Sequence, residues 1–155
     1  MLADFDARYM EMALAEARNA DAAGEVPVGA VIVIEGTVVA RAFNQPISTS
    51  DPTAHAEMVA LREATRAVGN YRLSAATMYC TLEPCMMCAG AMIHARIARL
   101  VFGALDPKAG SAGSIYNVLS DPRLNHRVEL VPGVRQAECS DLLRDFFSRR
   151  RKILE

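Results

Sequence analysis

Two cysteines and a histidine have the types and spacing that could bind a metal ion. Cys85 and Cys88 stand three residues apart in Pro-Cys-Met-Met-Cys, and on a helix this spacing places both on one face. In the first turn of a helix, unpaired N–H groups and the macrodipole favour their thiolates. His55, near the start of another expected helix, is a neutral third ligand. Two thiolates and one imidazole balance Zn²⁺ and leave a fourth position open, which predicts a catalytic rather than a structural zinc site.

Glu57 follows His55 by two residues and is the candidate proton shuttle. A carboxylate beside a zinc-activated water can take its proton and pass it to a substrate nitrogen. Residues two apart on a regular helix point about 200° away from one another. His55 and Glu57 can therefore face one site only if the helix starts irregularly between them, and spacing alone does not establish this.

The composition predicts one globular domain over residues 1–155. The chain is 52% hydrophobic, enough for a substantial core without disulfides. Its four cysteines therefore suggest metal or redox chemistry, with Cys80 and Cys139 as inert core thiols. Apolar runs such as 28–34 are too short to cross a bilayer. The first ten residues lack the apolar segment of a signal peptide, so we expect a cytoplasmic protein with no membrane partner.

Helices that alternate with strands predict an α/β fold, a three-layer α/β/α sandwich around a mixed sheet of about five strands. The turn at Glu35 and Gly36 predicts a hairpin, and Pro84 is expected to open a helix near its first turn. Residues 44–53 and 104–126 are expected to be loops, the second with a short helix near 115–119. Helices are expected over 5–23, 53–68, 84–94 and 137–152, the last within a basic C-terminal segment 137–155, and strands over 28–34, 37–43, 76–81, 99–103 and 127–131.

His-Ala-Glu and Glu-Pro-Cys-x-x-Cys are far more specific together than either is alone. Together they match the H-x-E…P-C-x-x-C signature of zinc-dependent deaminases. Further matching segments are Val-Pro-Val-Gly-Ala-Val (26–31), Asn44, Asp-Pro-Thr (51–53), Asn-Tyr-Arg (70–72), Met-Cys-Ala-Gly-Ala-Met-Ile-His (87–94), Asn-His-Arg-Val-Glu (125–129) and Asp-Phe-Phe (145–147). With these segments the chain resembles the bacterial tRNA-specific adenosine deaminases over nearly its whole length.

This resemblance implies the cytidine-deaminase fold, one Zn²⁺ per subunit and a homodimer. It implies conversion of adenosine to inosine at the wobble position of an arginine tRNA anticodon. Flipping a base out of its stack costs least in a single strand, a condition that an anticodon loop meets. The resemblance also implies contacts to the anticodon stem-loop. Asn44 is expected to contact the flipped base, Asp106 and Asn125 the target nucleotide or its neighbours, and Phe147 with the basic C-terminal residues the neighbouring anticodon nucleotides. The backbone at Ala54 is expected beside the pocket, and Pro84 is a further expected substrate-binding residue.

Two other functions remain open from the residues alone. One is deamination of a free base or nucleoside, such as guanine or cytidine. The other is a non-catalytic zinc module that binds RNA or protein. The net charge of −1 argues against non-specific nucleic-acid binding by the whole surface. A basic C-terminal cluster could be either a solvated helix face or a phosphate-contacting arm; it comprises Arg144, Arg149, Arg150, Arg151 and Lys152.

Several neighbouring residues have simpler interpretations than catalysis. Glu83 precedes the cysteine motif, and a structural or supporting role is expected because Glu57 already supplies the shuttle. Met86 and Met87 lie between the two cysteine ligands, where packing in the core or in a dimer is expected. The segment 110–113 lacks the lysine and strand of a phosphate-binding loop and is expected to be flexible.

Overall fold

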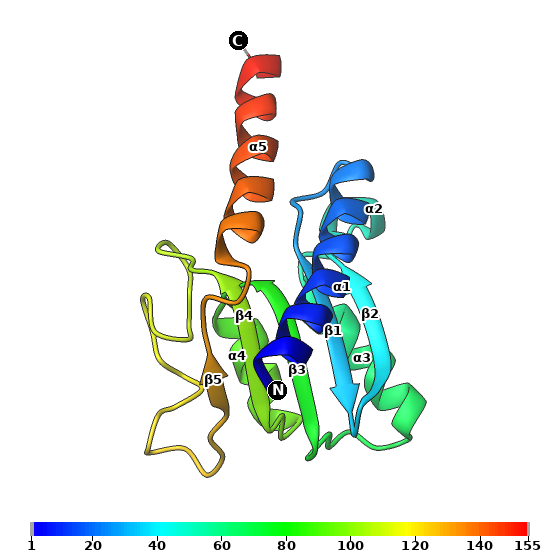
Figure 1. Cartoon of the computed structure of the whole chain (residues 1–155), viewed down its shortest axis with the longest axis vertical. Helices are drawn as coiled ribbons and strands as arrows, with labels where there is room; N and C mark the ends of the chain where they lie inside the picture. The colour runs from blue at the N-terminus through cyan, green and yellow to red at the C-terminus, as the bar shows by residue number, and fades with distance from the viewer. Residues whose placement is uncertain (1, 155) are drawn as a thin grey trace.

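A five-stranded mixed sheet forms the middle layer of the structure, a computed structural model that describes residues 2–154, with side chains from 4 to 153 (Figure 1). The strand order is β2-β1-β3-β4-β5. β1 pairs antiparallel with both β2 and β3, whereas β3, β4 and β5 run parallel. The strands are β1 (Gly29–Ile34), β2 (Thr37–Phe43), β3 (Ala76–Leu82), β4 (Arg99–Ala104) and β5 (Glu129–Val131).

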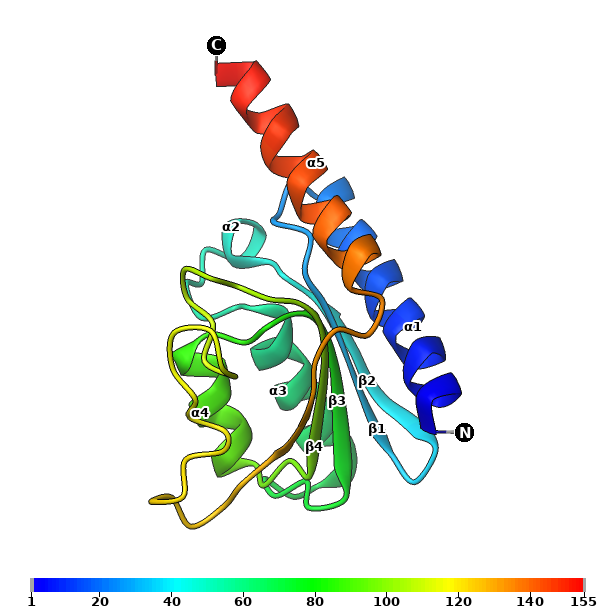
Figure 2. The same cartoon turned by 60° about the vertical axis from the view of Figure 1, so that its left-hand side comes forward.

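Helices cover both faces of this sheet, as Figure 2 shows. α1 (Leu2–Ala22) and α5 (Gln136–Leu154) lie on one face, and α3 (Ala56–Val68) and α4 (Met86–His94) lie on the other. Strand side chains alternate between the two cores, as a period of two requires: Met78 and Cys80 face α3 and α4, whereas Tyr79 faces α1. The predicted three-layer sandwich is confirmed. In the part of the chain that the structure describes, no helix is both long and apolar enough to cross a membrane.

The β1–β2 connection is the tight turn expected from its sequence. Glu35 and Gly36 both have positive φ, 49° and 77°, the backbone of a type I′ hairpin turn. The connections that flank the site differ from expectation. Segment 44–53 contains a one-turn helix, α2 (Pro46–Thr49). The prediction of a short helix near 115–119 was wrong. This stretch has no helix, and an isolated bridge instead pairs Ala112 with Asn117.

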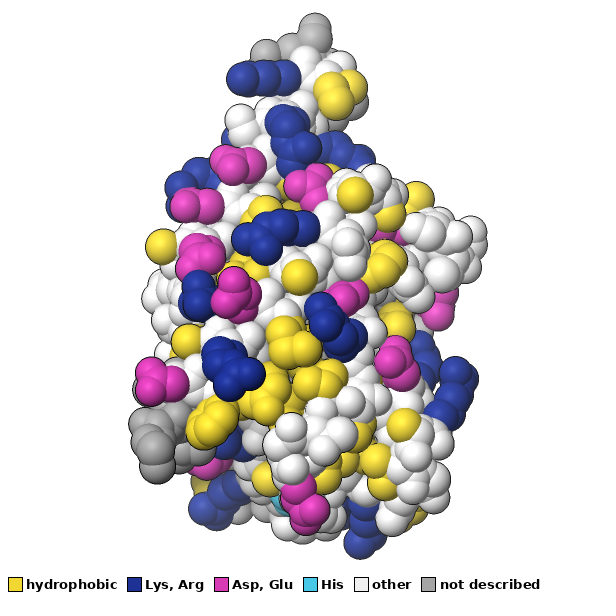
Figure 3. Space-filling view, turned by 45° about the vertical axis from the view of Figure 1, so that its right-hand side comes forward, with side chains coloured by type: hydrophobic (Ala, Val, Ile, Leu, Met, Phe, Trp, Pro, Cys, Tyr) yellow, Lys and Arg dark blue, Asp and Glu magenta, His cyan; other side chains and the backbone are white. Residues whose placement is uncertain are grey.

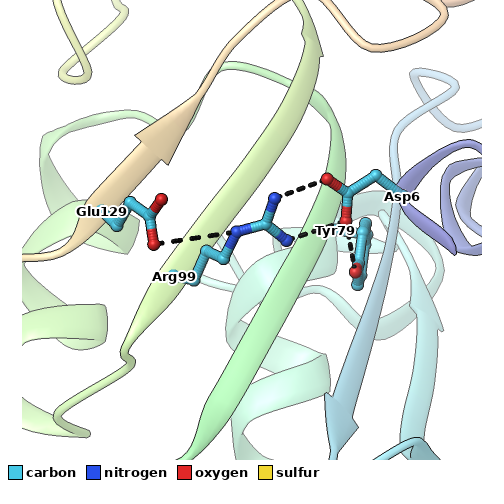
Figure 4. Close-up of polar contacts among 4 residues, drawn as sticks. All are labelled: Asp6, Tyr79, Arg99 and Glu129. Atoms are coloured by element: carbon cyan, nitrogen blue, oxygen red, sulfur yellow. Dashed lines mark hydrogen bonds and ion pairs between the residues drawn. The ribbon is translucent and has the colours of Figure 1, made fainter. Parts of the chain in front are cut away.

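A buried ionic cluster fixes α1 against the sheet (Figure 4). Arg99, at the start of β4, donates two hydrogen bonds to the Asp6 carboxylate on α1, at 2.8 and 2.5 Å. The Tyr79 hydroxyl donates to the same carboxylate at 2.8 Å, and Glu129 lies 3.9 Å from Arg99 Nε at the rim. Hydrogen bonds from Arg99 lower the pKa of Asp6, against the opposing effect of burial. We call Asp6, Tyr79 and Arg99 the α1 ionic cluster.

Candidate active site

The three predicted metal ligands lie at the N-terminal ends of two helices. His55 is the N-cap of α3 and Cys85 is the N-cap of α4, and both have extended backbones, with φ −66°, ψ 151° and φ −77°, ψ 176°. Neither side chain caps its own helix, so both are available to a ligand. Cys88 lies in the first turn of α4. Both helices begin later than predicted, α3 at Ala56 rather than near 53 and α4 two residues after Pro84, because the ligand residues themselves occupy the cap positions.

The distances between these side chains fit a tetrahedral zinc ion. His55 Nδ1 lies 3.5 Å from the Sγ atoms of both Cys85 and Cys88. All three ligand atoms lie within 4.8 Å of one another. Zinc bonds of about 2.3 Å to sulfur and about 2.0–2.1 Å to nitrogen would separate tetrahedral N and S ligands by about 3.6 Å. We call these three residues the metal-binding group.

The electrostatics of the metal-binding group also favour a cation. Hydrogen bonds from Cys88 and then His55 lower the pKa of Cys85 to about 4, although burial opposes this. The pKa of Cys88 is raised, because the neighbouring Cys85 sulfur and burial both disfavour a second negative charge. Two sulfurs this close repel one another as thiolates unless a positive charge lies between them. The donor set, two thiols and an imidazole, therefore fits Zn²⁺ in chemistry as well as in distance.

Glu57 and His55 reach one pocket because α3 begins between them. His55 precedes the helix with an extended backbone, so the angular separation of residues on a regular helix does not apply to this pair. Glu57 lies in the first turn of α3 and is only 4% exposed. Burial raises the pKa of its carboxyl group. The irregular helix start that the sequence required but could not establish is present.

A pocket of about 230 Å³ opens beside the metal-binding group. Asn44 enters it directly after β2 and is fixed by its backbone N–H, which donates to Val28 at 3.0 Å. Asp106 enters it from the segment after β4. Five segments distant in sequence thus meet at one site. The lining residues are Val26, Val28, Asn44, His55, Glu57, Leu82, Glu83, Cys85, Asp106 and Ala109.

Four of the residues implied to contact substrate do not line this pocket. Ala54 is buried and lines a neighbouring cavity of about 350 Å³ against the outer side of α3. Pro84 is buried, and its carbonyl accepts a hydrogen bond from the Ser111 N–H at 2.8 Å. Asn125 is exposed on the 119–128 segment, and Phe147 is 44% exposed on α5. Asn44 and Asp106 are the two that the structure brings to the pocket.

Sequence reasoning did not place the apolar walls of the pocket. Val26 and Val28 come from the segment before β1, and Leu82 is the last residue of β3. All three lie at or next to the end of a buried strand, and the ends of neighbouring strands meet at the same edge of the sheet. This feature of the sequence could have predicted them as pocket residues. Glu83, expected to have a structural role, also lines the pocket, and its carboxylate is occupied by hydrogen bonds from the chain.

The whole chain, and not only the metal-binding group, is similar to known deaminases. A model of the MafB19-like deaminase family matches residues 5–151. The tRNA-specific adenosine deaminase of Bacillus subtilis (strain 168) is 48% identical over 147 residues, which cover 95% of this chain and 91% of that protein. The chain belongs to the tRNA-specific adenosine deaminase family. The resemblance of the sequence to this family is therefore confirmed.

Solved structures distinguish this family from other deaminases of similar fold. A structure from a study of A-to-I editing by tRNA:A34 deaminases at the wobble position of transfer RNA matches this deaminase with a TM-score of 0.85 and 45% identity. That match covers 88% of this chain and 99% of the other. The guanine deaminase of Bacillus subtilis matches with a TM-score of 0.62 and 37% identity over 68% of each chain. The similarity to the tRNA:A34 deaminase is closer and extends over more of this deaminase.

Proposed function

We propose that this deaminase converts adenosine to inosine at the wobble position of a tRNA anticodon, with an arginine tRNA as substrate, in the cytoplasm. The observation that carries this proposal is that buried Glu57 lines the same pocket as His55 and Cys85 of the metal-binding group. A structural zinc site would not need a buried carboxylate beside it. The similarity to tRNA-specific adenosine deaminases over nearly the whole chain supports the choice of substrate.

Hydrolytic deamination requires a nucleophile, a proton carrier and a site that holds the base. A zinc ion held by His55, Cys85 and Cys88 would supply a water activated for attack at neutral pH. Glu57 carries the protons: it accepts one from the water and donates it to N1 of the adenine ring. As the water oxygen bonds to C6 and the C6–amino bond breaks, Glu57 takes the second proton from that oxygen and donates it to the departing amino nitrogen, so that adenosine and water give inosine and ammonia. Its burial in the pocket excludes bulk water from these transfers.

The pocket suits a single flipped base. Its volume of about 230 Å³ is below the roughly 300–1,000 Å³ of pockets for drug-sized ligands. Val26, Val28 and Leu82 provide apolar walls for the ring faces. The Asn44 amide offers both a donor and an acceptor for the polar edge of the base. We propose that Asp106, which also lines the pocket, contacts the target nucleotide.

The C-terminal helix is the proposed arm for the neighbouring nucleotides. α5 projects beyond the body of the molecule and carries several Lys and Arg side chains (Figure 3). Arg149 pairs with Asp21 at 2.7 Å, and Arg150 lies over the Phe146 ring, so part of the basic cluster anchors α5 to the chain. We propose that exposed Phe147 stacks on a nucleotide beside the target and that Arg151 and Lys152 approach phosphates.

Asn125, Ala54 and Pro84 remain proposed contacts to the RNA or supports of the pocket.

We also propose a homodimer formed through the outer faces of α3 and α4. A cleft of about 290 Å³ there is lined in part by Tyr71, which is 66% exposed, and Met86, the first residue of α4, is also exposed. Apolar groups gathered on one face mark an association surface. Sedimentation velocity tests this directly. Tyr71→Glu should shift the protein to monomer, whereas Phe5→Glu, on the opposite side of the sheet, should not. Wild-type protein that sediments only as a monomer contradicts the proposal.

The activity is tested by measuring inosine in a short anticodon stem-loop with adenosine at the wobble position. Free adenosine, cytidine and guanine are assayed in parallel, together with a stem-loop in which the adenosine is moved to another loop position. We expect inosine in the first stem-loop only. A stem-loop from a different tRNA that also carries a wobble adenosine tests the preference for the arginine tRNA.

Deamination of a free base is the second candidate, favoured by the match to the guanine deaminase. If guanine or a free nucleoside is turned over at least as well as the stem-loop, the metal-binding group and Glu57 keep their roles. The substrate assignment and the role of α5 would then be wrong. Absence of all turnover in zinc-loaded protein would instead favour a non-catalytic zinc module.

A further inference from the structure

We propose that Glu83 is a positioning residue that holds the pocket wall formed by residues 105–114, and with it Asp106, in the arrangement that receives the substrate. Glu83 directly follows β3 and is 2% exposed. It lines the pocket together with Asp106 and Ala109. The inference rests on the proposed function only for the identity of the substrate.

The Glu83 carboxylate is filled by donors from the 105–114 segment. Oε1 accepts hydrogen bonds from the Asp106 N–H at 3.0 Å and the Ser114 hydroxyl at 2.5 Å. Oε2 accepts from the N–H groups of Ala112 and Ser114, both at 3.0 Å. A carboxylate has about four acceptor positions. All of them are used here, so Glu83 has no free lone pair with which to take a proton from water or to bind a substrate donor.

The 105–114 segment depends on this carboxylate because it has no regular secondary structure of its own. Without the carboxylate, the buried Ala112 N–H would lose its partner, which is costly, and the part-buried bonds of Asp106 and Ser114 would also be lost. The segment is also held by the Ser111 N–H, which donates to the carbonyl of Pro84, and by Ala112, which packs in the core. Figure 2 shows the segment after β4 running beside α4. The buried Glu83 carboxylate thus holds the backbone of residues 106–114 against the end of β3.

Gly110 shows how closely the segment wraps the carboxylate. A Cβ atom at position 110 would overlap the carboxyl group of Glu83. Gly110 is not among the glycines with positive φ, so an alanine there would be excluded by contact with Glu83 rather than by backbone strain. The substitution Gly110→Ala therefore perturbs the carboxylate without altering its charge.

This arrangement matters for function because it positions Asp106. Its Oδ1 accepts the N–H groups of Lys108 and Ala109, at 3.1 and 3.2 Å, while its own N–H donates to Glu83. Glu83 therefore fixes the backbone that aims Asp106 at the rim of the pocket. Loss of this anchor should weaken substrate binding more than the chemical step, which Glu57 and the metal-binding group perform.

The first test compares Glu83→Gln with wild type. The amide directs N–H groups at two of the four donors, so we expect KM for the stem-loop to rise about tenfold, kcat to fall less than KM rises, and zinc content to stay unchanged. Amide hydrogen exchange over 105–114 should lose protection while α3 and β3 keep theirs. Asp6→Asn, in the remote α1 ionic cluster, is the control for general destabilisation and should change neither KM nor exchange in this segment.

A double-mutant cycle provides the second test. Gly110→Ala should reproduce the KM effect in wild type, but in a Glu83→Ala background it should add almost nothing, because the carboxyl group that it would meet is absent. Ser114→Ala removes one donor and should raise KM about two- to threefold. It remains informative if the Glu83 variants do not fold.

Three results would overturn the inference: unchanged exchange over 105–114 in Glu83→Gln, a fall in kcat at constant KM, or equal effects of Gly110→Ala in both backgrounds. The exchange experiment needs no substrate. If the wild-type enzyme makes no inosine, the proposed function fails, while exchange still decides the role of Glu83.

Discussion

The metal-binding group and the α1 ionic cluster use buried polar atoms in opposite ways. In the α1 ionic cluster, the Asp6 carboxylate receives both guanidinium bonds of Arg99 and the Tyr79 hydroxyl, so its charges are matched within the chain. In the metal-binding group, two sulfurs and a ring nitrogen converge on one another. A cluster whose charges are matched internally stabilises the fold, whereas converging ligand atoms need an ion from outside to relieve their repulsion.

The two clusters are also well separated, so their effects can be measured independently. Arg99 begins β4 and Ala104 ends it near the pocket, which places them about 17 Å apart along the strand. Tyr79 faces α1, whereas the metal-binding group lies on the side of α3 and α4. Substitutions in one cluster should therefore not couple to the other.

Removing a ligand should have the largest effect. We expect Cys85→Ala to lose zinc and all measurable inosine formation, because two remaining ligands cannot hold the ion at an open site. Metal analysis of the purified protein and the stem-loop assay check this. Cys139→Ala, which removes a buried thiol outside the site, should keep its zinc. A fully zinc-loaded Cys85→Ala protein would disprove the assigned ligand set.

Removing the shuttle should have the next largest effect. Glu57→Ala should reduce turnover of the stem-loop by about 10²–10⁴-fold, the usual contribution of general acid–base catalysis. Its zinc content and unfolding midpoint should stay close to those of wild type, because the ligands are intact. Full activity in this variant would show that another group carries the proton.

Breaking the α1 ionic cluster should change stability and leave chemistry alone. Asp6→Asn leaves Arg99 without its main counter-charge and should lower the free energy of unfolding by about 3 kcal/mol, the lower end for a buried pair, since Arg99 is partly exposed. Urea unfolding measures this loss, and turnover per zinc-loaded molecule should be unchanged. Asp141→Asn breaks an exposed pair with Arg144 and should cost less than about 1 kcal/mol. Lost turnover in folded Asp6→Asn would contradict the separation of the two clusters.

The smallest predicted effect is a pH dependence of the difference in unfolding free energy between wild type and Asp6→Asn. The hydrogen bonds and charge of Arg99 hold the pKa of Asp6 below its ordinary value of 3.8. A carboxyl group whose pKa is lower in the folded state contributes stability above its unfolded pKa and loses it as pH falls through the folded pKa. The gap in unfolding free energy between wild type and Asp6→Asn should thus be constant near neutral pH and narrow below about pH 4. A gap that stays constant in acid would contradict the assigned pair.

The sequence by itself determined the layered fold and predicted which residues form the candidate metal-binding group. The ligands and Glu57 lie in two short motifs whose chemistry is visible without coordinates, and strand and helix periodicity depends on neighbouring residues. Four of the five strands were predicted to within one residue at each end, and the fifth, β5, begins two residues later than predicted. The starts of α3 and α4 were predicted three and two residues too early, because His55 and Cys85 occupy the cap positions rather than the first helical turn.

Only the tertiary structure decided which residues share the pocket. Asn44 follows β2 and Asp106 follows β4, and in the sheet these strands are separated by β1 and β3. Nothing in the sequence near either residue predicts this strand order, which brings both residues to the same pocket. The same holds for Glu83, whose four donors come from residues 106–114, more than twenty positions away. Irregular segments have no periodicity of their own, so their positions depend on distant hydrogen-bond partners that appear only when the sheet is assembled.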